Sequence, residues 1–209
     1  MKLLLHTCCA PCSVQCIEAL GEEGIMPELL WYNPNIHPFT EYRSRKEALI
    51  LLARDKQLSL TVEDDYGLRS FVKAVFSFQE NSLQENSIGE SAEQPACGVN
   101  SRCAYCYSLR MEKTACLAAE KGCDAFSTTL LISPYQNHEL IRKTGEDLAV
   151  RYGIQFLYRD FRQRFREGQK QAREAGYYMQ KYCGCIYSEE ERYLGLPDKE
   201  KSEKQDNAV

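Results

Sequence analysis

Three cysteines lie within five residues near the start of the chain, immediately after a short apolar run. Residues 2–6 have the composition of a buried strand, the segment Cys-Cys-Ala-Pro-Cys follows at positions 8–12, and a helical pattern covers residues 13–23. In parallel α/β sheets, ligands bind at the carboxyl ends of the strands. The sequence therefore predicts an α/β fold whose first strand delivers thiols to a binding edge.

Strand-like and helix-like segments alternate along most of the chain. Further strand candidates span residues 26–32, 58–62, 124–131 and 154–158, and helical patterns cover residues 39–56, 67–78, 101–121 and 135–152. Such alternation favours sequential parallel strands joined by right-handed crossovers. We therefore expect one α/β domain over residues 1–195.

Two segments depart from this pattern. Residues 79–100 are rich in Gln, Glu, Asn, Ser and Gly, which predicts an exposed loop or insertion. Residues 196–209 form a charged tail that we expect to be disordered. No run of eighteen apolar residues suggests a membrane span, and the three leucines at 3–5 are too few for a signal peptide. We expect a protein that does not associate with membranes.

Seven of the eleven cysteines fall into three motifs. Adjacent or nearly adjacent thiols suit ligands that converge on a metal better than they suit ordinary disulfides. Together with the missing export signal, this favours a reduced, cytoplasmic protein. The motifs are Cys8/Cys9/Cys12, Cys103/Cys106 and Cys183/Cys185.

Each motif alone fits several kinds of centre, but the three together narrow the choice. A C-x-x-C pair at 103–106 is compatible with zinc, a redox disulfide or iron-sulfur ligation. Gly184 allows the third pair to point both sulfurs the same way. Seven thiols exceed what one tetrahedral zinc uses and suit a thiolate-bound cluster, with zinc alone as the alternative. Of the other cysteines, Cys16, Cys116 and Cys123 are expected to pack in the core or on helix faces, and Cys97 is not assigned to the site.

Six ordered motifs resemble those of the QueH-type epoxyqueuosine reductases and together cover most of the chain from residue 3 to about residue 190. They read LLHTCCAPC at 4–12, YNPNIHP at 32–38 with EY at 41–42 and RK at 45–46, RCAYCYSLR at 102–110, STTLLISPYQNH at 127–138, DFR at 160–162 and QKYCGCIYS at 180–188. The segments 79–100 and 196–209 carry no pattern of this family.

The resemblance implies reduction of epoxyqueuosine to queuosine at the wobble position of tRNA, with a 4Fe-4S cluster and an additional iron ion nearby. The implied partners are a tRNA anticodon stem-loop and an external low-potential electron donor. The implied fold is a Rossmann-like parallel sheet related to the adenine-nucleotide α-hydrolase-like group, with a helical C-terminal segment that carries the third cysteine motif. Carried onto this chain, the cofactor ligands are Cys8, Cys9, Cys103, Cys106, Cys183 and Cys185, and Cys12 joins them as a metal ligand. The spacing leaves open how they divide between cluster and iron.

Removing an epoxide oxygen as water takes two electrons and two protons, so the reaction also needs a proton donor. His37, Tyr107 and His138 lie in the matching motifs and are the catalytic candidates, with Tyr135 beside them. The alternative is a structural role, since a histidine beside a proline or at a helix start often serves the fold.

Six cations within fifteen residues could hold anticodon phosphates despite the net charge of -4, or could form a solvated helix face. They are Arg159, Arg162, Arg164, Arg166, Lys170 and Arg173. Several tyrosines near the cysteines could stack on splayed bases or simply pack around the cofactor. They are Tyr105, Tyr107, Tyr177, Tyr178 and Tyr182.

Two other classes of function compete with the reductase. One is a non-catalytic, RNA-interacting module that binds zinc or another metal through one or two of the cysteine motifs. The other is an α/β enzyme that uses an adenine nucleotide. Against the latter, cysteines occupy the turn after the first strand, where a phosphate-cradling loop needs glycines or serines.

Overall fold

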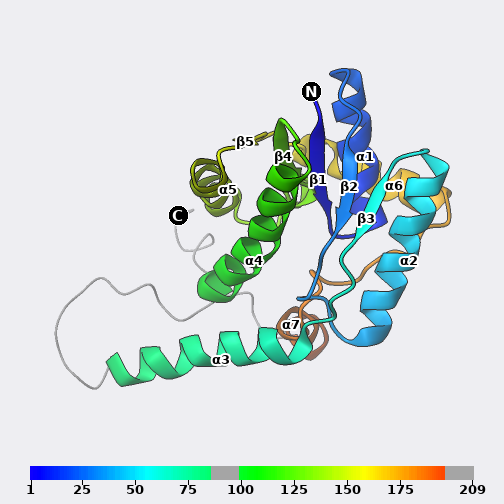
Figure 1. The fold of residues 1–209 in the computed structure, drawn as a ribbon. Helices are drawn as coiled ribbons and strands as arrows, with labels where there is room; N and C mark the ends of the chain where they lie inside the picture. Colours follow the sequence, from blue (N-terminus) through cyan, green and yellow to red (C-terminus); the bar gives the residue numbers. More distant parts are fainter. Residues whose placement is uncertain (86–98, 196–209) are drawn as a thin grey trace, which may run out of the picture.

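Five parallel strands form one sheet in the order β3-β2-β1-β4-β5 in the computed structural model, which describes residues 1–85 and 99–195 (Figure 1). The strands are β1 (Leu3–Thr7), β2 (Glu28–Trp31), β3 (Leu60–Val62), β4 (Ala125–Thr128) and β5 (Gln155–Phe156). Each neighbouring pair is parallel, which confirms the predicted α/β class with a Rossmann-like strand order.

The central strand β1 is buried along its whole length because three leucines pack on both faces of the sheet. Its last two residues are polar and nevertheless fully buried. Thr7 donates to the carbonyl of Leu30 at 2.8 Å, and His6 Nδ1 lies 2.9 Å from Thr128 Oγ1. These side chains satisfy one another and tie the carboxyl ends of β1, β2 and β4 together.

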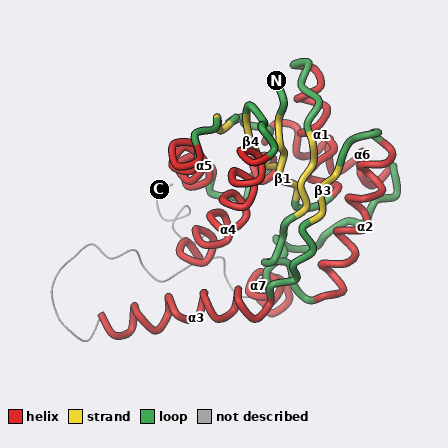
Figure 2. Tube along the Cα trace, in the orientation of Figure 1, coloured by secondary structure: helices red, strands yellow, loops and turns green. Residues whose placement is uncertain are grey.

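Helices cover both faces of the sheet (Figures 1 and 2). One face carries α1 (Ala10–Glu22), α2 (Phe39–Asp55) and α6 (Phe165–Glu174), and α6 packs along α1. The other carries α4 (Val99–Glu120) and α5 (His138–Tyr152), which pack on each other. Two further helices, α3 (Leu68–Glu85) and α7 (Ile186–Leu194), lie below the carboxyl edge of the sheet.

Two predicted boundaries were wrong. The predicted loop at 79–100 begins later, because α3 continues to Glu85 through good helix formers such as Gln79 and Glu80, and α4 already starts at Val99. The fourth strand ends at Thr128 and not at residue 131, because the Thr128 hydroxyl accepts from the Leu130 N–H and caps a 3-10 helix, Thr129–Ile132. Residues 86–98 and the predicted tail at 196–209 lie outside the described residues.

The chain leaves β1 toward β2 and β3 on one side and later returns to β4 on the other side. Ligands in such sheets bind where the strand order reverses, outside the carboxyl ends. Cys8 follows β1 at this point and Thr129 follows β4, and the Cys8 N–H donates to Thr129 Oγ1 at 3.3 Å. The first cysteine motif therefore sits at the switch point of the sheet.

Among the helices of the described residues, none is both long enough and apolar enough to cross a membrane. The single domain over residues 1–195 and the cytoplasmic location stay predictions.

Candidate metal centre

The sulfur atoms of Cys8, Cys9 and Cys12 lie within 4.8 Å of one another and all three residues are buried. Pro11 occupies the first turn of α1 and Cys9 is its N-cap residue, whose thiol makes no capping hydrogen bond. The turn that starts α1 therefore aims three sulfurs at one point. Within residues 1–85 and 99–195, this is the one group of three or more potential metal ligands at such short range.

This group is built to hold negative charge. Hydrogen bonds from Cys12 and Cys9 lower the pKa of Cys8 well below the usual value of a thiol. Burial raises the pKa of Cys9, and the hydrogen bond to Cys8 raises the pKa of Cys12. The hydrogen bonds among the three sulfurs therefore favour a thiolate at Cys8, and Gln180 Nε2 donates to Cys12 Sγ from outside at 3.5 Å. The donor set suits a thiophilic metal.

The other two motifs form a second thiol group. Burial and then the charge of Cys183 raise the pKa of Cys103 to about 12. Burial raises the pKa of Cys106 as well, and the charges of Cys183, Cys185 and Cys103 act in the same direction. Cys106 and Cys185 also belong to one apolar cluster with Phe71 and Val75, so the fold brings the second and third motifs together.

Two of the three motifs stand at helix N-termini, and the second lies one to two turns into a helix. Cys9 and Cys12 begin α1, Cys103 and Cys106 lie near the start of α4, and Cys185 is the N-cap of α7. The amide groups and the positive dipole end of a helix favour thiolates there. Two helices, α1 and α7, thus present their positive ends to the sulfurs of the first and third motifs.

The third motif is fastened by the buried side chain of Arg45, which is 1% exposed. Its guanidinium pairs with Glu41 at 2.7 Å and donates to the carbonyl oxygens of Tyr182 and Cys183 at 2.9 Å each. The charges of Cys9 and Cys8 also act on Arg45. This arginine therefore fastens the loop of the third motif to α2.

Gly184 allows this loop to pass close to Arg45. Its φ is +140°, a value that side chains with Cβ rarely adopt, and an added Cβ would lie 3.2 Å from both Arg45 Nη1 and Ile36 Cγ1. The loop is also held by its own backbone, because the Gly184 carbonyl accepts from the His37 N–H at 2.7 Å.

We expect Gly184→Ala to displace Cys183 and Cys185 and to cost about 1–3 kcal/mol of unfolding free energy. Urea denaturation of the metal-free protein measures the stability, and iron retained per chain after reconstitution measures the displacement. Gly176→Ala is the matched control, because Gly176 also has a positive φ of +73° but nothing within 4 Å. Equal losses in both variants would contradict the role of the close approach.

A second arginine, Arg110, is 2% exposed and contacts the second thiol group. Its Nη2 donates to Cys106 Sγ and its Nε to the Cys106 carbonyl, both at 3.0 Å. The charges of Cys106, Cys183 and Cys8 all act on it. No ion pair with a carboxylate is found for Arg110 in the described part of the chain, so the thiols are its natural counter-charge.

The catalytic candidate His37 is fully buried against the rings of Tyr66 and Phe71, both at 5.4 Å between centroids. Its Nε2 lies 3.1 Å from the Pro34 carbonyl, and its buried Nδ1 has no hydrogen-bond partner in the described residues. Burial lowers the pKa of His37 to about 4, so its ring is neutral at pH 7. Its part in catalysis stays a prediction.

Because the folded pKa of His37 lies below the unfolded value of about 6.5, the unfolded chain binds more protons between pH 4 and pH 6.5. This residue's contribution to stability should be complete above pH 6.5 and decline as the pH falls toward 4, with a slope of at most about 1.4 kcal/mol per pH unit. Denaturation of the metal-free wild type and of His37→Gln across this range measures the difference. If the difference in unfolding free energy between the wild type and His37→Gln stays constant with pH, the low pKa of His37 is refuted.

The other two catalytic candidates differ in position. Tyr107 is buried, donates to Gln136 Oε1 at 2.7 Å, and Gln136 Nε2 in turn donates to Cys183 Sγ at 3.4 Å. Burial and the nearby Cys103 raise the pKa of Tyr107, so it keeps its proton. His138 has both ring nitrogens beside Tyr158 and Ser133, at 3.4 and 3.2 Å, where it begins α5. These contacts favour the structural alternative for His138.

Half of the basic run is neutralised. Arg159, Arg162 and Arg164 pair with Glu23, Asp160 and Glu22. No such pair is seen within the described residues for Arg166, Lys170 and Arg173, which lie on or beside α6. Among the tyrosines, Tyr177 and Tyr178 donate to Asp55 and Glu41. Packing therefore occupies part of the predicted RNA surface.

The cysteines outside the motifs that the structure describes do not join the site. Cys16 is fully buried in the core, and Cys116 lies along α4, where its thiol donates to Glu120 at 3.3 Å. Cys123 is half-buried after α4, and Cys97 lies outside the described residues.

Sequence reasoning missed the residues that hold the thiols. These are Arg45, Arg110, Thr129, Gln136 and Gln180. One of them was within reach, because Arg110 follows Cys106 by four residues and so shares its helix face.

The comparisons with known proteins agree with this geometry. The family model described as epoxyqueuosine reductase QueH matches residues 3–191. The epoxyqueuosine reductase QueH of Dehalococcoides mccartyi is 36% identical over 197 residues, which cover 94% of this chain and 97% of that protein. The one of Thermotoga maritima is 33% identical over 195 residues, with 91% of each chain covered.

Among solved structures, a predicted subunit of a tRNA methyltransferase from Methanocaldococcus jannaschii has a TM-score of 0.46 at 15% identity, covering 87% of this chain and 94% of that chain. A likeness at this level carries no argument. The family model and the two relatives span nearly the whole chain, and the chain belongs to the QueH family of epoxyqueuosine reductases.

Proposed function

We propose that this chain reduces epoxyqueuosine to queuosine in the anticodon loop of tRNA and uses an iron-sulfur cluster to do so. The relatives named epoxyqueuosine reductase support the reaction. The observation that best supports the iron-sulfur cofactor is the close group of Cys8, Cys9 and Cys12 at the switch point of the sheet. A non-catalytic zinc module is disfavoured, because those relatives are named as enzymes.

We assign the cofactor to the seven cysteines of the three motifs. The residues fit such a group, since every donor is a thiol. The buried guanidinium groups of Arg45 and Arg110 lie beside the motifs and can balance thiolate charge. When bound, a 4Fe-4S cluster would supply electrons singly and an iron ion beside it would act as a Lewis acid. The protein's own part is to hold the thiols, keep out water and deliver protons.

The reaction has a fixed balance. Both C–O bonds of the epoxide break, a C=C bond forms, and the oxygen leaves as water with two electrons and two protons. The residue in the site best placed to hold a proton is Tyr107, which stays protonated and connects through Gln136 to Cys183. We propose Tyr107 as a proton donor or relay, with His37 contacting the substrate as a neutral ring.

The tRNA needs a surface that receives phosphates beside this site. We propose that Arg166, Lys170 and Arg173 contribute it, since they form no ion pair with the residues that the structure describes, and α6 packs along α1, which carries the first motif. Electrons come from an external low-potential donor.

The test is anaerobic purification with iron and sulfide reconstitution, followed by incubation with epoxyqueuosine-containing tRNA and dithionite. Mass analysis of the released nucleosides should find the loss of one oxygen from the modified base. A brown, iron-loaded protein that leaves the tRNA unchanged would reject the substrate, and a colourless zinc protein would reject the cofactor.

A further inference from the structure

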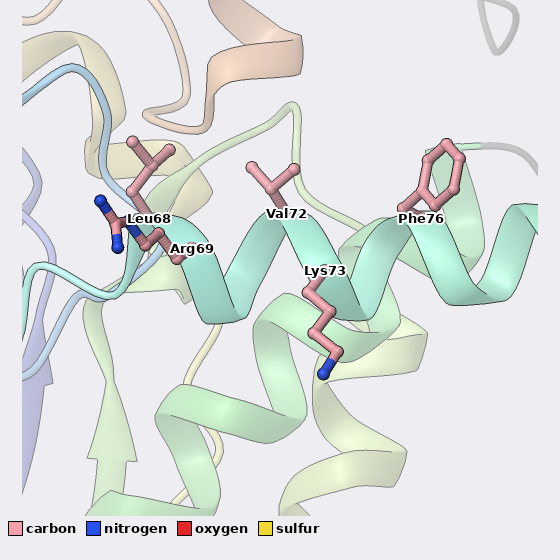
Figure 3. A pocket seen from close by; sticks show the side chains of 5 residues that line it. All are labelled: Leu68, Arg69, Val72, Lys73 and Phe76. Atoms are coloured by element: carbon pink, nitrogen blue, oxygen red, sulfur yellow. The ribbon is translucent and has the colours of Figure 1, made fainter.

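One face of α3 forms a shallow apolar hollow of about 480 Å³ at the surface. Leu68, Val72 and Phe76 follow one another at four-residue spacing and line it, and Figure 3 shows these three side chains rising from the same side of the helix. Phe76 is 54% exposed, and Leu68 and Val72 are half-buried. Exposed apolar side chains that gather in one place are typical of interaction sites.

Two cations border this hollow, Arg69 and Lys73. Both are exposed, and within the described residues neither forms an ion pair. No acidic residue occurs between positions 68 and 79 of the sequence. The α3 face, defined here as these two cations with Leu68, Val72 and Phe76, therefore combines an apolar centre with a positive rim that lacks its counter-charge.

The neighbouring face of α3 packs on the second thiol group. Phe71 and Val75 are 1% and 4% exposed and form one apolar cluster with Cys106 and Cys185. An α-helix with its side chains is about 10–12 Å across. A partner seated on the α3 face would therefore stand about one helix diameter from two of the proposed cluster ligands.

We propose that the α3 face is the docking site of the electron donor, an acidic electron-transfer protein. Protein interfaces have an apolar core with a charged rim, and opposite charges across them steer the encounter. RNA fits less well, because phosphate binding rests on many cations and this face has two beside three apolar side chains. The inference rests on the proposed function, since it supplies the electrons of that reaction.

The electron balance sets the stoichiometry of docking. Each reduced partner with a one-electron centre gives up one electron to the cysteine-bound group and leaves oxidised. Two partner molecules are therefore oxidised for each epoxide reduced, and the two protons come from the reductase side.

The experiment compares two reductants in the reconstituted protein, a reduced acidic 2Fe-2S ferredoxin and dithionite. Arg69→Glu with Lys73→Glu should raise the KM for ferredoxin about tenfold or more, because both rim charges become repulsive, and leave the dithionite-driven rate unchanged. Ferredoxin binding to the same variant, measured by titration calorimetry, should weaken by the same factor. The control for Lys73→Glu alone is Lys143→Glu, because Lys143 is an exposed lysine on α5. Lys143→Glu should change neither the KM for ferredoxin nor the affinity for ferredoxin.

Several outcomes would overturn the proposal. The first is ferredoxin binding that is undetectable in the wild type, or equally strong in the double variant. The second is a KM for tRNA that rises in the double variant with either reductant, which would make the face an RNA site. The third is an altered oligomeric state of the double variant, which would make the face a contact between copies of the chain. Failure of the proposed function is a separate result, because dithionite would then drive no reduction in the wild type while the calorimetric test of docking still stands.

Discussion

Replacing Cys106 by alanine is expected to remove most of the bound iron and to lower the rate of epoxyqueuosine reduction by on the order of 100-fold or more. Cys106 is buried, accepts a hydrogen bond from Arg110 and shares its surroundings with Cys103, Cys183 and Cys185. Its loss would leave one coordination position without a thiolate. Iron per chain after anaerobic reconstitution and the mass of the tRNA nucleosides measure the two effects.

The control lies on the same helix. Cys116 is ten positions further along α4, and its thiol faces Glu120 and not the other sulfurs. Cys116→Ala should keep both iron and activity, whereas Cys183→Ala should behave like Cys106→Ala. If all three variants lose iron equally, the assignment of ligands to the motifs is wrong.

Much of the fold could be predicted because its signals are local. An all-buried apolar strand followed by a cysteine turn and a helix is visible in residues 3–22, and the alternation of strands and helices indicates a parallel sheet. The order β3-β2-β1-β4-β5 places the reversal between β1 and β4. The strand that carries Cys8 is therefore also the strand at which ligands bind in such sheets.

Contacts between distant segments could not be predicted in the same way. Arg45 reaches across 138 positions to the Cys183 carbonyl, and Gln180 across 168 positions to Cys12. No periodicity or propensity encodes such a pairing, because it depends on how helices from both halves of the chain meet. The motifs predicted which thiols matter, while the polar groups that hold them required coordinates.

A local conflict explains the errors at element ends. The polar composition after residue 78 suggested a loop, but the same Gln and Glu residues are good helix formers, and α3 already has its buried side against Cys106 and Cys185. Composition alone does not distinguish an exposed helix from an exposed loop. The part of this helix that supports the second thiol group is Phe71 and Val75, which lie within the predicted helical segment.

Replacing Arg110 by an uncharged residue should weaken iron binding without lowering the stability of the metal-free protein. Its guanidinium is buried, and the described residues offer it no carboxylate. Burial raises the pKa of Cys106 and Cys103, so these thiols are neutral at pH 7 without metal, and the charge of Cys8 is left to compensate the cation. Bound metal turns the thiols into thiolates, and the same cation then becomes stabilising.

We therefore expect Arg110→Met to make the metal-free protein at least as stable as the wild type, because a buried charge without a carboxylate partner is replaced by an apolar chain of similar length. The same variant should lose about 10–100-fold in iron affinity, since the charge-assisted donor to Cys106 Sγ is gone. Arg110→Lys keeps the charge, and its iron affinity should lie between those of the wild type and Arg110→Met. Urea denaturation without metal and iron titration under anaerobic conditions measure both quantities. A metal-free Arg110→Met protein that is several kcal/mol less stable yet binds iron normally would show that Arg110 serves the fold and not the thiolates.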